Sequence, residues 1–260
     1  MNVILIAHTP DPEKVVAAAA KLCYSKASIT DLMDGLNNEK VASFLDKLSG
    51  LGHASPTEHA SFTFGIEGVS RSFLAQSTRH RIASYSVQSQ RYVDMSKADM
   101  VIPPAIAQDG EAYEAFSQAV KSAKYAYGHL HHVLEDTHTY ELMRENPNMT
   151  EKQARVKASK MANEDARFIL PEACQTRMIV TMNARELNDF FKLRCCNRAQ
   201  WEIRCVADEM LKLVYPIAPH LFKDAGPGCV AGKGCTEGSM TCGHMAQIQD
   251  KYNKIKEALV

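Results

Sequence analysis

A cluster of basic side chains between residues 79 and 91 has the residue types and spacing best suited to chemistry in this sequence. Arg79, His80 and Arg81 are consecutive, and Arg91 follows after a polar segment. Arginine stays charged, and its planar guanidinium group donates paired hydrogen bonds to phosphate or carboxylate oxygens. The cluster therefore predicts binding of an anionic small molecule.

The spacing within this cluster suggests two separate anionic sites. The segment after Ser70 or Ser72 is typical of a helix that continues to about residue 82. Residues two positions apart on a helix point about 200° from each other. On such a helix Arg79 and Arg81 would face different ligands, and Gln76 would share the face of Arg79.

A second group of arginines lies at the predicted ends of helices and strands. Its members are Arg167, Arg177, Arg185, Arg194 and Arg198. Basic residues dispersed in this way favour discrete phosphate or carboxylate pockets over one continuous basic face. The chain has 30 Lys and Arg against 30 Asp and Glu, so it has no net field that would attract nucleic acid. We expect no nucleic-acid partner, and a phosphate- or nucleic-acid-binding module without catalysis is the alternative.

The elements that must position these side chains alternate between strands and helices. Residues 2–7, 61–66 and 176–182 have the apolar runs, alternation or β-branched content of strands. Helices are expected after Pro12, over residues 38–48, over most of residues 105–170 with a break near Pro147, and in two segments after residue 183. Residues 83–104 are expected to be irregular. The pattern predicts an α+β fold with a central sheet flanked by helices.

The composition indicates a protein that works in the cytoplasm and does not enter a membrane. Every apolar run is shorter than the roughly 18 to 20 residues that a membrane span needs. The first residues have no basic segment before their short apolar run, which is typical of a strand and not of a signal peptide. The eight cysteines have no disulfide-framework spacing in the main body, as expected of reduced thiols.

The basic cluster also belongs to a longer pattern. Arg79-His80-Arg81, then seven residues, Ser89, one residue and Arg91 resemble the signature of the flavin-dependent thymidylate synthases. The similarity covers roughly residues 1 to 220 and includes further blocks in the family's order: Gly52-His53, Pro56–His59, Arg167 with Leu170-Pro171, Asn183–Arg185, Leu193-Arg194 and Ala199–Arg204.

The resemblance implies a fold, an assembly and a reaction. It implies an α+β catalytic domain over residues 1–222 and a homotetramer whose active sites lie between subunits. The implied reaction methylates dUMP at C5 to give dTMP. The one-carbon unit comes from 5,10-methylenetetrahydrofolate, and the electrons come from NADPH through bound FAD. Residues 223–260, a Cys/Gly-rich extension and a terminal helix, are left without a clear counterpart in the family's pattern.

Site residues follow from the matched positions. The resemblance places dUMP against Gln76, Arg79, Val87, Gln88, Ser89, Gln90, Arg91, Arg167 and Arg194. It places FAD against Ser55, Arg79, His80, Arg81, Asn183, Arg185 and Asp189. His53 and Tyr92 are candidates for stacking near the flavin or the folate. Arg194 resembles the family's activating arginine, whose guanidinium beside the uracil would stabilise negative charge that develops on the ring.

Three of these positions require comment. Ser89 has only Gln88 and Gln90 beside it and therefore no adjacent base, so we expect it to position the substrate and not to act as a nucleophile. Val87 stands where many relatives carry glutamate, so only its backbone can contribute. Asp189 stands where an amide is common, and an ionised carboxylate accepts hydrogen bonds but cannot donate them.

The cysteines offer two other readings. A thymidylate synthase or another methyltransferase that depends on a thiol nucleophile would use Cys195 or Cys196. No Pro-Cys-His context surrounds them, and small packing residues are the simpler interpretation. In the tail, zinc could bind Cys229, Cys235, Cys242 and His244. Their gaps of five, six and one residue differ from standard zinc-knuckle spacing, so we expect no metal and a glycine-rich appendage with reduced thiols.

Overall fold

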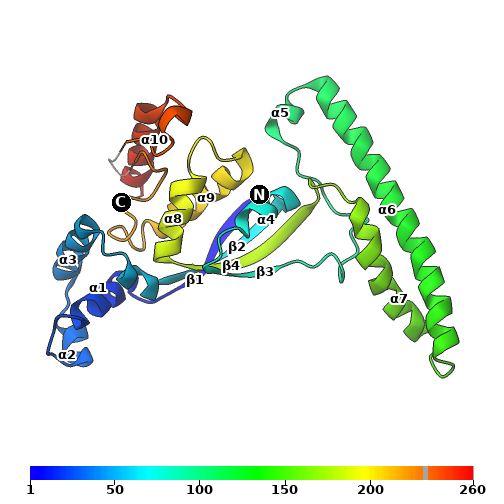
Figure 1. Ribbon diagram of the computed structural model, residues 1–260, viewed down its shortest axis with the longest axis horizontal. Helices are drawn as coiled ribbons and strands as arrows, with labels where there is room; N and C mark the ends of the chain where they lie inside the picture. The colour runs from blue at the N-terminus through cyan, green and yellow to red at the C-terminus, as the bar shows by residue number, and fades with distance from the viewer. Residues whose placement is uncertain (231–233, 260) are drawn as a thin grey trace. The chain divides into compact units, whose positions relative to one another are not determined.

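The computed structural model describes residues 1–230 and 234–259. Residues 231–233 and 260, which fall within the predicted tail, lie outside the described residues. The chain divides into two compact units (Figure 1). Unit 1 comprises residues 1–67, 75–86 and 178–260, and unit 2 comprises residues 68–74 and 87–177. This grouping joins residues 223–260 to unit 1, and the boundary at residue 222 stays a prediction.

A four-stranded sheet with the order β1-β2-β4-β3 forms the centre of the fold. The strands are β1 (Asn2–His8), β2 (Ser61–Ser70), β3 (Ala83–Val87) and β4 (Gln175–Asn183). The expected strands at residues 2–7, 61–66 and 176–182 are confirmed. The expectation of an irregular segment from residue 83 is wrong at its start, because β3 pairs within the sheet. Its Ala-Ser-Tyr-Ser-Val sequence alternates between less polar and polar residues, a strand signal that the expectation overlooked.

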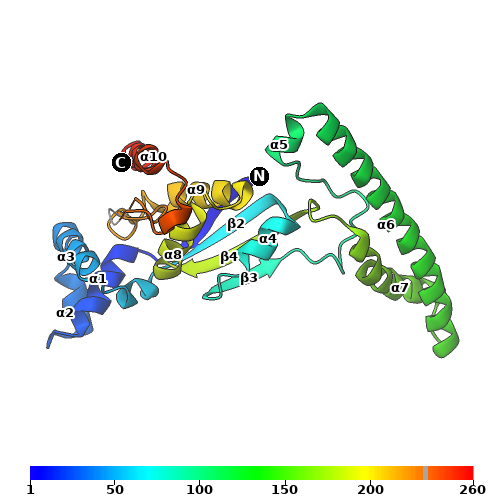
Figure 2. The same ribbon diagram turned by 45° about the horizontal axis from the view of Figure 1, so that its top comes forward.

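Helices α8 (Ala184–Arg194) and α9 (Trp201–Val214) cover one face of this sheet (Figures 1 and 2). Their apolar residues recur at helical spacing, so one stripe of each helix is buried. The rings of Phe62 on β2 and Phe191 on α8 both pack edge-on against Phe222, with centroid distances of 5.4 and 6.0 Å. The predicted pair of helices on the sheet is confirmed, and this aromatic core fixes α8 in position.

The N-terminal helices of unit 1 are α1 (Pro12–Leu22), α2 (Ile29–Asp34) and α3 (Asn38–Leu51), followed by the 3₁₀ helix η1 (Ser55–His59). The helices expected after Pro12 and over residues 38–48 are confirmed. Helix α3 ends at Gly52, whose φ of 72° is the left-handed conformation that glycine adopts without strain. Helix α2 was not predicted from the sequence. It has only six residues and buries none of them, although Ile29, Leu32 and Met33 have helical spacing and Ser28 caps its first turn.

Helix α4 (Arg71–Ser77) ends five residues earlier than expected. The backbone N–H groups of Arg79 and His80 donate to the carbonyl groups of Gln76 and Ser77, at 3.4 and 3.1 Å, and so form a turn. The argument that Arg79 and Arg81 lie on opposite sides of one helix is therefore wrong. Both are exposed residues of the segment that leads into β3.

Unit 2 contains the long helix α6 (Gly110–Glu145), which packs side by side with α7 (Glu151–Ala166) (Figures 1 and 2). The short helix α5 (Pro104–Ala107) precedes them, and the 3₁₀ helix η2 (Arg167–Ile169) follows. The predicted break near Pro147 is confirmed, and Thr150 and Gln153 form a capping box at the start of α7. In the core, the hydroxyl of Tyr127 accepts from the N–H of Met95 at 3.1 Å.

The C-terminal segment contains the 3₁₀ helix η3 (Gly238–Met240) and helix α10 (Met245–Glu257). The expected terminal helix is confirmed. Helix α10 is anchored within unit 1, because the buried Tyr252 hydroxyl donates to the carbonyl of Cys195 at 3.1 Å and Lys251 pairs with Asp208 at 2.6 Å. Across residues 1–230 and 234–259, no helix combines the length and the apolar character needed to span a membrane.

Candidate functional site

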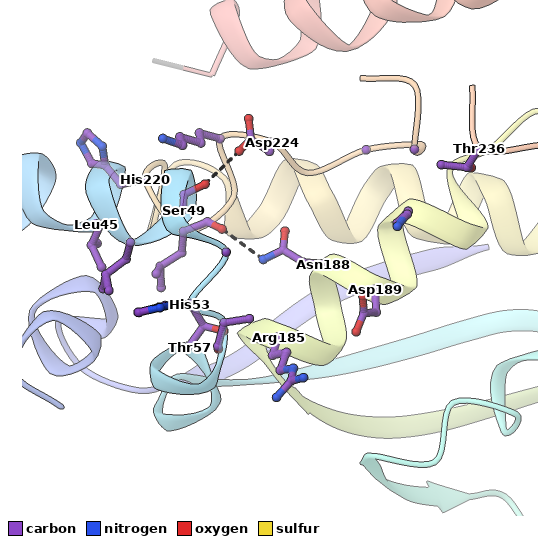
Figure 3. A pocket seen from close by; sticks show the side chains of 18 residues that line it. Leu45, Ser49, His53, Thr57, Arg185, Asn188, Asp189, His220, Asp224 and Thr236 are labelled. Atoms are coloured by element: carbon purple, nitrogen blue, oxygen red, sulfur yellow. Dashed lines mark hydrogen bonds between the residues drawn. The ribbon is translucent and has the colours of Figure 1, made fainter. Parts of the chain in front are cut away.

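A pocket of about 410 Å³ lies in unit 1 between helix α3, helix α8 and the chain that follows α9 (Figure 3). Arg185, Asp189 and Lys192 line it from α8, and His53 lines it from the end of α3. The three positions on α8 are four and three residues apart, so they share one face of the helix. The volume is in the range of small-molecule sites in proteins.

Further polar side chains of the pocket come from the chain after α9. His220 and Lys223 line the pocket, and the Lys223 ammonium lies 2.8 Å from Asp46. This hydrogen bond lowers the pKa of the Asp46 carboxyl. On α8, Arg185 pairs with Glu58, and both side chains are about half exposed. The pocket thus combines Arg185, Lys192 and Lys223 with the carboxylates of Asp189 and Asp224. Its cationic side chains are of the type that binds a phosphate-bearing ligand.

Beside this pocket, within unit 1, a hydrogen-bonded network holds Arg194 at the end of α8. The Glu186 carboxylate lies 2.9 Å from His80 Nδ1, and Arg194 Nε donates to His80 Nε2 at 3.0 Å. Arg194 Nη2 also donates to the carbonyl of Gln76 at 3.2 Å. Glu186 and His80 are buried, with 8% and 7% of their surface exposed. The guanidinium is therefore fixed from two sides.

The ionisation of this network follows from its burial. Burial lowers the pKa of His80 below its ordinary value, against the opposing effect of the Glu186 carboxylate. Arg194 lowers the His80 pKa further. The pKa of Arg194 itself is lowered by burial and by the nearby charge of Arg79. The lowered pKa favours the neutral form of His80 beside the cationic Arg194.

Both ring nitrogens of His80 are occupied in this network. The imidazole therefore supports Arg194, and the predicted FAD contact of His80 stays a prediction. Asn183 is also engaged, since its side-chain oxygen accepts from the Glu186 N–H at 2.9 Å and caps α8. Ser55, Arg79 and Arg81 are exposed, and of the seven predicted FAD residues Arg185 and Asp189 line the pocket.

In unit 2, the structure gathers two of the predicted dUMP residues around Glu164 of α7. Arg91 Nη2 lies 2.8 Å from the Glu164 carboxylate, and Arg167 Nε donates to the Glu164 carbonyl at 3.1 Å. The guanidinium of Arg91 also lies over the ring of Tyr92, 5.8 Å from its centroid. The two arginines are thus neighbours, as a binding site for a dianionic phosphate requires.

In the segment between β3 and Arg91, backbone N–H groups donate two of the hydrogen bonds. Val87 ends β3, and the N–H of Gln88 donates to the carbonyl of Arg177 at 3.0 Å. Ser89 Oγ accepts from the N–H of Arg91 at 3.2 Å. Gln90 is buried and its amide donates to Cys174 Sγ at 3.7 Å, and its predicted contact with dUMP stays a prediction. Its side chain faces the core of unit 2.

Several residues of the site were missed from the sequence, among them Glu186, Lys192, His220 and Lys223. Lys192 and Glu186 could have been found from helical spacing, since they lie on the turns of α8 that carry Arg185 and Asp189. His220 and Lys223 gave no such signal, because the fold brings them to the pocket from a loop after α9.

The cysteines do not support a thiol nucleophile. Cys195 is buried, and burial together with Asp208 raises the pKa of its thiol well above the ordinary value, so it stays protonated. Cys196 lines a cavity of about 10 Å³ with Cys229, Cys235 and Cys242, whereas the His244 ring is hydrogen-bonded to Gln247 at 2.8 Å.

The zinc alternative is tested by a metal assay on the purified protein. In the described ranges 1–230 and 234–259, no three His, Cys, Asp or Glu side chains are placed to ligate one metal ion. The four cysteines of the cavity include Cys196, which was not among the candidate zinc ligands.

Comparison with known proteins identifies the family of this chain. The model of the family described as "Thymidylate synthase complementing protein" matches residues 4–220. A flavin-dependent thymidylate synthase from Clostridium tetani is 48% identical over 252 residues, which are 97% of each chain. This chain belongs to the flavin-dependent thymidylate synthase family. The family's enzymes from Geobacter sulfurreducens and Pyrococcus furiosus are 46% and 36% identical, and each alignment covers at least 98% of both chains.

A solved structure of the family confirms the fold. The flavin-dependent thymidylate synthase of Helicobacter pylori, complexed with FAD and dUMP, aligns with a TM-score of 0.59 at 22% identity. The alignment covers 87% of this chain and 100% of that chain. The α+β prediction is confirmed. Because the full-length relatives align over 97–99% of this chain, most of residues 223–260 also has a counterpart in the family.

Proposed function

We propose that this chain is an FAD-dependent thymidylate synthase that methylates dUMP at C5 to give dTMP. Arg194 carries the proposal. It resembles the family's activating arginine, and the network with His80 and Gln76 fixes its Nε and Nη2 atoms, which supports the proposal. Among the described residues, Arg194 Nη1 has no hydrogen-bond partner, so this nitrogen can donate to a ligand. A fixed guanidinium can stabilise the negative charge that develops on a uracil ring without rearranging during the reaction.

The pocket of unit 1 fits the phosphate-bearing part of a flavin nucleotide. Its cationic side chains and its volume of about 410 Å³ support FAD as the cofactor. Arg185 and Asp189 would hold the cofactor from α8, as the family resemblance implies, and His53 lines the same pocket. Bound FAD supplies the electron transfer that amino-acid side chains cannot perform. Lys192 and Lys223 add positive charge that the predicted FAD set did not include.

For dUMP, we propose that the two arginines beside Glu164 bind the 5′-phosphate. Arg91 and Arg167 supply the charge, and Ser89 and the backbone of residues 87–88 position the nucleotide. Gln76 and Arg79 belong to unit 1 with Arg194, whereas residues 87–91 and Arg167 belong to unit 2. The Helicobacter pylori relative was crystallised with FAD and dUMP together, which supports this pair of ligands.

We also propose a homotetramer in the cytoplasm, with NADPH as reductant and 5,10-methylenetetrahydrofolate as one-carbon donor. The uncovered face of the sheet supports the assembly. Ile4 and Ile6 on β1 and Ile179 on β4 are 50%, 50% and 48% exposed. Strand β2 lies between β1 and β4. Exposed apolar side chains on strands of one sheet are typical of a surface that another subunit covers. Sedimentation of the purified protein tests the tetramer.

The proposed function is tested by the visible spectrum of protein that has been mixed with FAD and desalted. We expect retained flavin, bleaching on anaerobic addition of NADPH, and a change in the bleaching rate when dUMP is present. Product analysis with methylenetetrahydrofolate should then detect dTMP. Folded, assembled protein that retains no flavin and shows no dUMP effect would instead favour the phosphate- or nucleic-acid-binding alternative, which predicts binding with strong salt dependence.

The Arg185→Ala variant is expected to weaken FAD binding about 10- to 100-fold, since a hydrogen bond to a charged group contributes roughly 1.5–3 kcal/mol. The Glu58→Gln variant should tighten FAD binding, because Arg185 no longer has to leave an ion pair. Fluorescence titration of the apoprotein with FAD measures both. Arg144→Ala, at an exposed residue of α6, is the matched control. Equal affinities in all variants would remove Arg185 from the FAD site.

A further inference from the structure

The buried carboxylate of Glu186 needs an explanation, because burying an ionised group is costly unless it is paired. Helix α8 is capped by Asn183, and Glu186 is the third residue of the helix. A glutamate at this position commonly reaches back to the N–H of the capping residue. Here its carboxylate instead makes a hydrogen bond to His80, a residue 106 positions away in the sequence. The carboxylate is therefore used to hold an imidazole.

The pairing determines which nitrogen of His80 carries the proton. An ionised carboxylate can only accept, so Nδ1 must donate to Glu186 across the 2.9 Å contact. Nε2 of the neutral ring is then a lone-pair acceptor, as its 3.0 Å contact with the Nε–H of Arg194 requires. The other tautomer would place two N–H groups against each other. Glu186 thus selects the only neutral form of His80 that can bind Arg194.

We propose that Glu186 and His80 are positioning residues that hold the Arg194 guanidinium in its working orientation. This inference rests on the proposed function, because it assigns their role through Arg194. Carboxylate, imidazole and guanidinium form one chain of hydrogen bonds, and the edge of the His80 ring packs on Phe190 with a centroid distance of 4.8 Å. Neither residue is required to touch the substrate or the cofactor.

The chain of hydrogen bonds also predicts an acid limb in the pH profile. Protonation of His80 would place an N–H on Nε2, and Arg194 would lose its acceptor. The charged and titratable groups that influence His80 are Glu186 and Asp189 on α8, and Arg194 at its end. Tyr85 on β3 donates to the His80 carbonyl at 3.0 Å. Because burial lowers the His80 pKa, activity should be retained at neutral pH and fall as the pH drops through the lowered His80 pKa.

The first test replaces the carboxylate by an amide. Glu186→Gln is expected to lower kcat about 10- to 100-fold. The dissociation constant of FAD should differ from that of the wild type by less than about threefold. An amide can also donate to Nδ1, which permits the wrong tautomer of His80. The ¹⁵N chemical shifts of the His80 ring in wild-type and variant protein report that tautomer without any turnover. Glu39→Gln, at an exposed residue in the first turn of α3, is the control and should match the wild type.

The second test replaces His80 by a side chain that does not titrate but can still form hydrogen bonds to Glu186 and Arg194. In His80→Gln, the amide oxygen can accept from Arg194 while the amide nitrogen donates to Glu186. This variant should retain more activity than His80→Ala and should lose the acid limb of the kcat profile. If the wild type turns over dUMP while Glu186→Gln keeps both its kcat and the Nδ1–H tautomer, the inference is overturned. Wild-type protein that lacks flavin-dependent turnover would instead overturn the proposed function, and the tautomer measurement would still test the network.

Discussion

The Arg194→Lys variant should lose about 10²–10³-fold in kcat while FAD remains bound, an effect typical of removing one preorganised donor from an active site. Lysine keeps the positive charge, so the loss would come from geometry. One ammonium group cannot donate to His80 Nε2 and the Gln76 carbonyl and still present a planar face of donors to uracil. The variant therefore separates fixed orientation from simple charge.

Single-turnover measurements on protein with reduced flavin are the appropriate assay, because they isolate the chemical steps from product release. The flavin spectrum after desalting serves as the check on cofactor binding. Arg144→Lys, the same substitution at an exposed residue of α6, should leave kcat unchanged. A kcat for Arg194→Lys within about twofold of wild type would mean that the oriented guanidinium is not required, and the proposed role of Arg194 would fail.

Local patterns in the sequence account for most of the fold. The strands β1, β2 and β4 and the helices α1, α3, α6, α7, α8 and α9 were predicted from an apolar pattern, a clear cap or a composition typical of the element. The end of α4 was not, because it depends on a residue outside the helix. Tyr85 of β3 donates to the carbonyl groups of Ser77 and His80, at 2.7 and 3.0 Å, and so stabilises the turn that stops the helix.

The site shows the same division between local and long-range information. The spacing of Arg185 and Asp189 on α8 is visible in the sequence, and the structure places both in one pocket. The role of His80 was not visible, because its partners Glu186 and Arg194 lie 106 and 114 residues away. Motif resemblance places a residue in a site but does not say whether its side chain faces the ligand or a neighbour in the protein.

The second large effect concerns the core that supports α8. Phe191→Ala is expected to lower the free energy of unfolding of unit 1 by about 3–5 kcal/mol, which is typical of truncating a buried phenylalanine. Phe191 is fully buried and packs edge-on against Phe222 and Phe190, with centroid distances of 6.0 and 6.1 Å. The alanine variant leaves a cavity where three rings meet, and the surrounding backbone closes it only in part.

Phe191→Leu is the matched variant, because it keeps most of the side-chain volume and should cost less than half as much as the alanine substitution. Urea denaturation followed by the fluorescence of Trp201 on α9, the single tryptophan of the chain, measures both at one protein concentration. Phe190 contacts both the His80 ring and the ring of Phe191. The alanine variant should therefore also loosen the His80 side chain that orients Arg194. We expect a lower kcat at temperatures where the protein is still folded. A loss of stability with unchanged kcat would show that the Glu186–His80–Arg194 network keeps its geometry independently of the core beneath it.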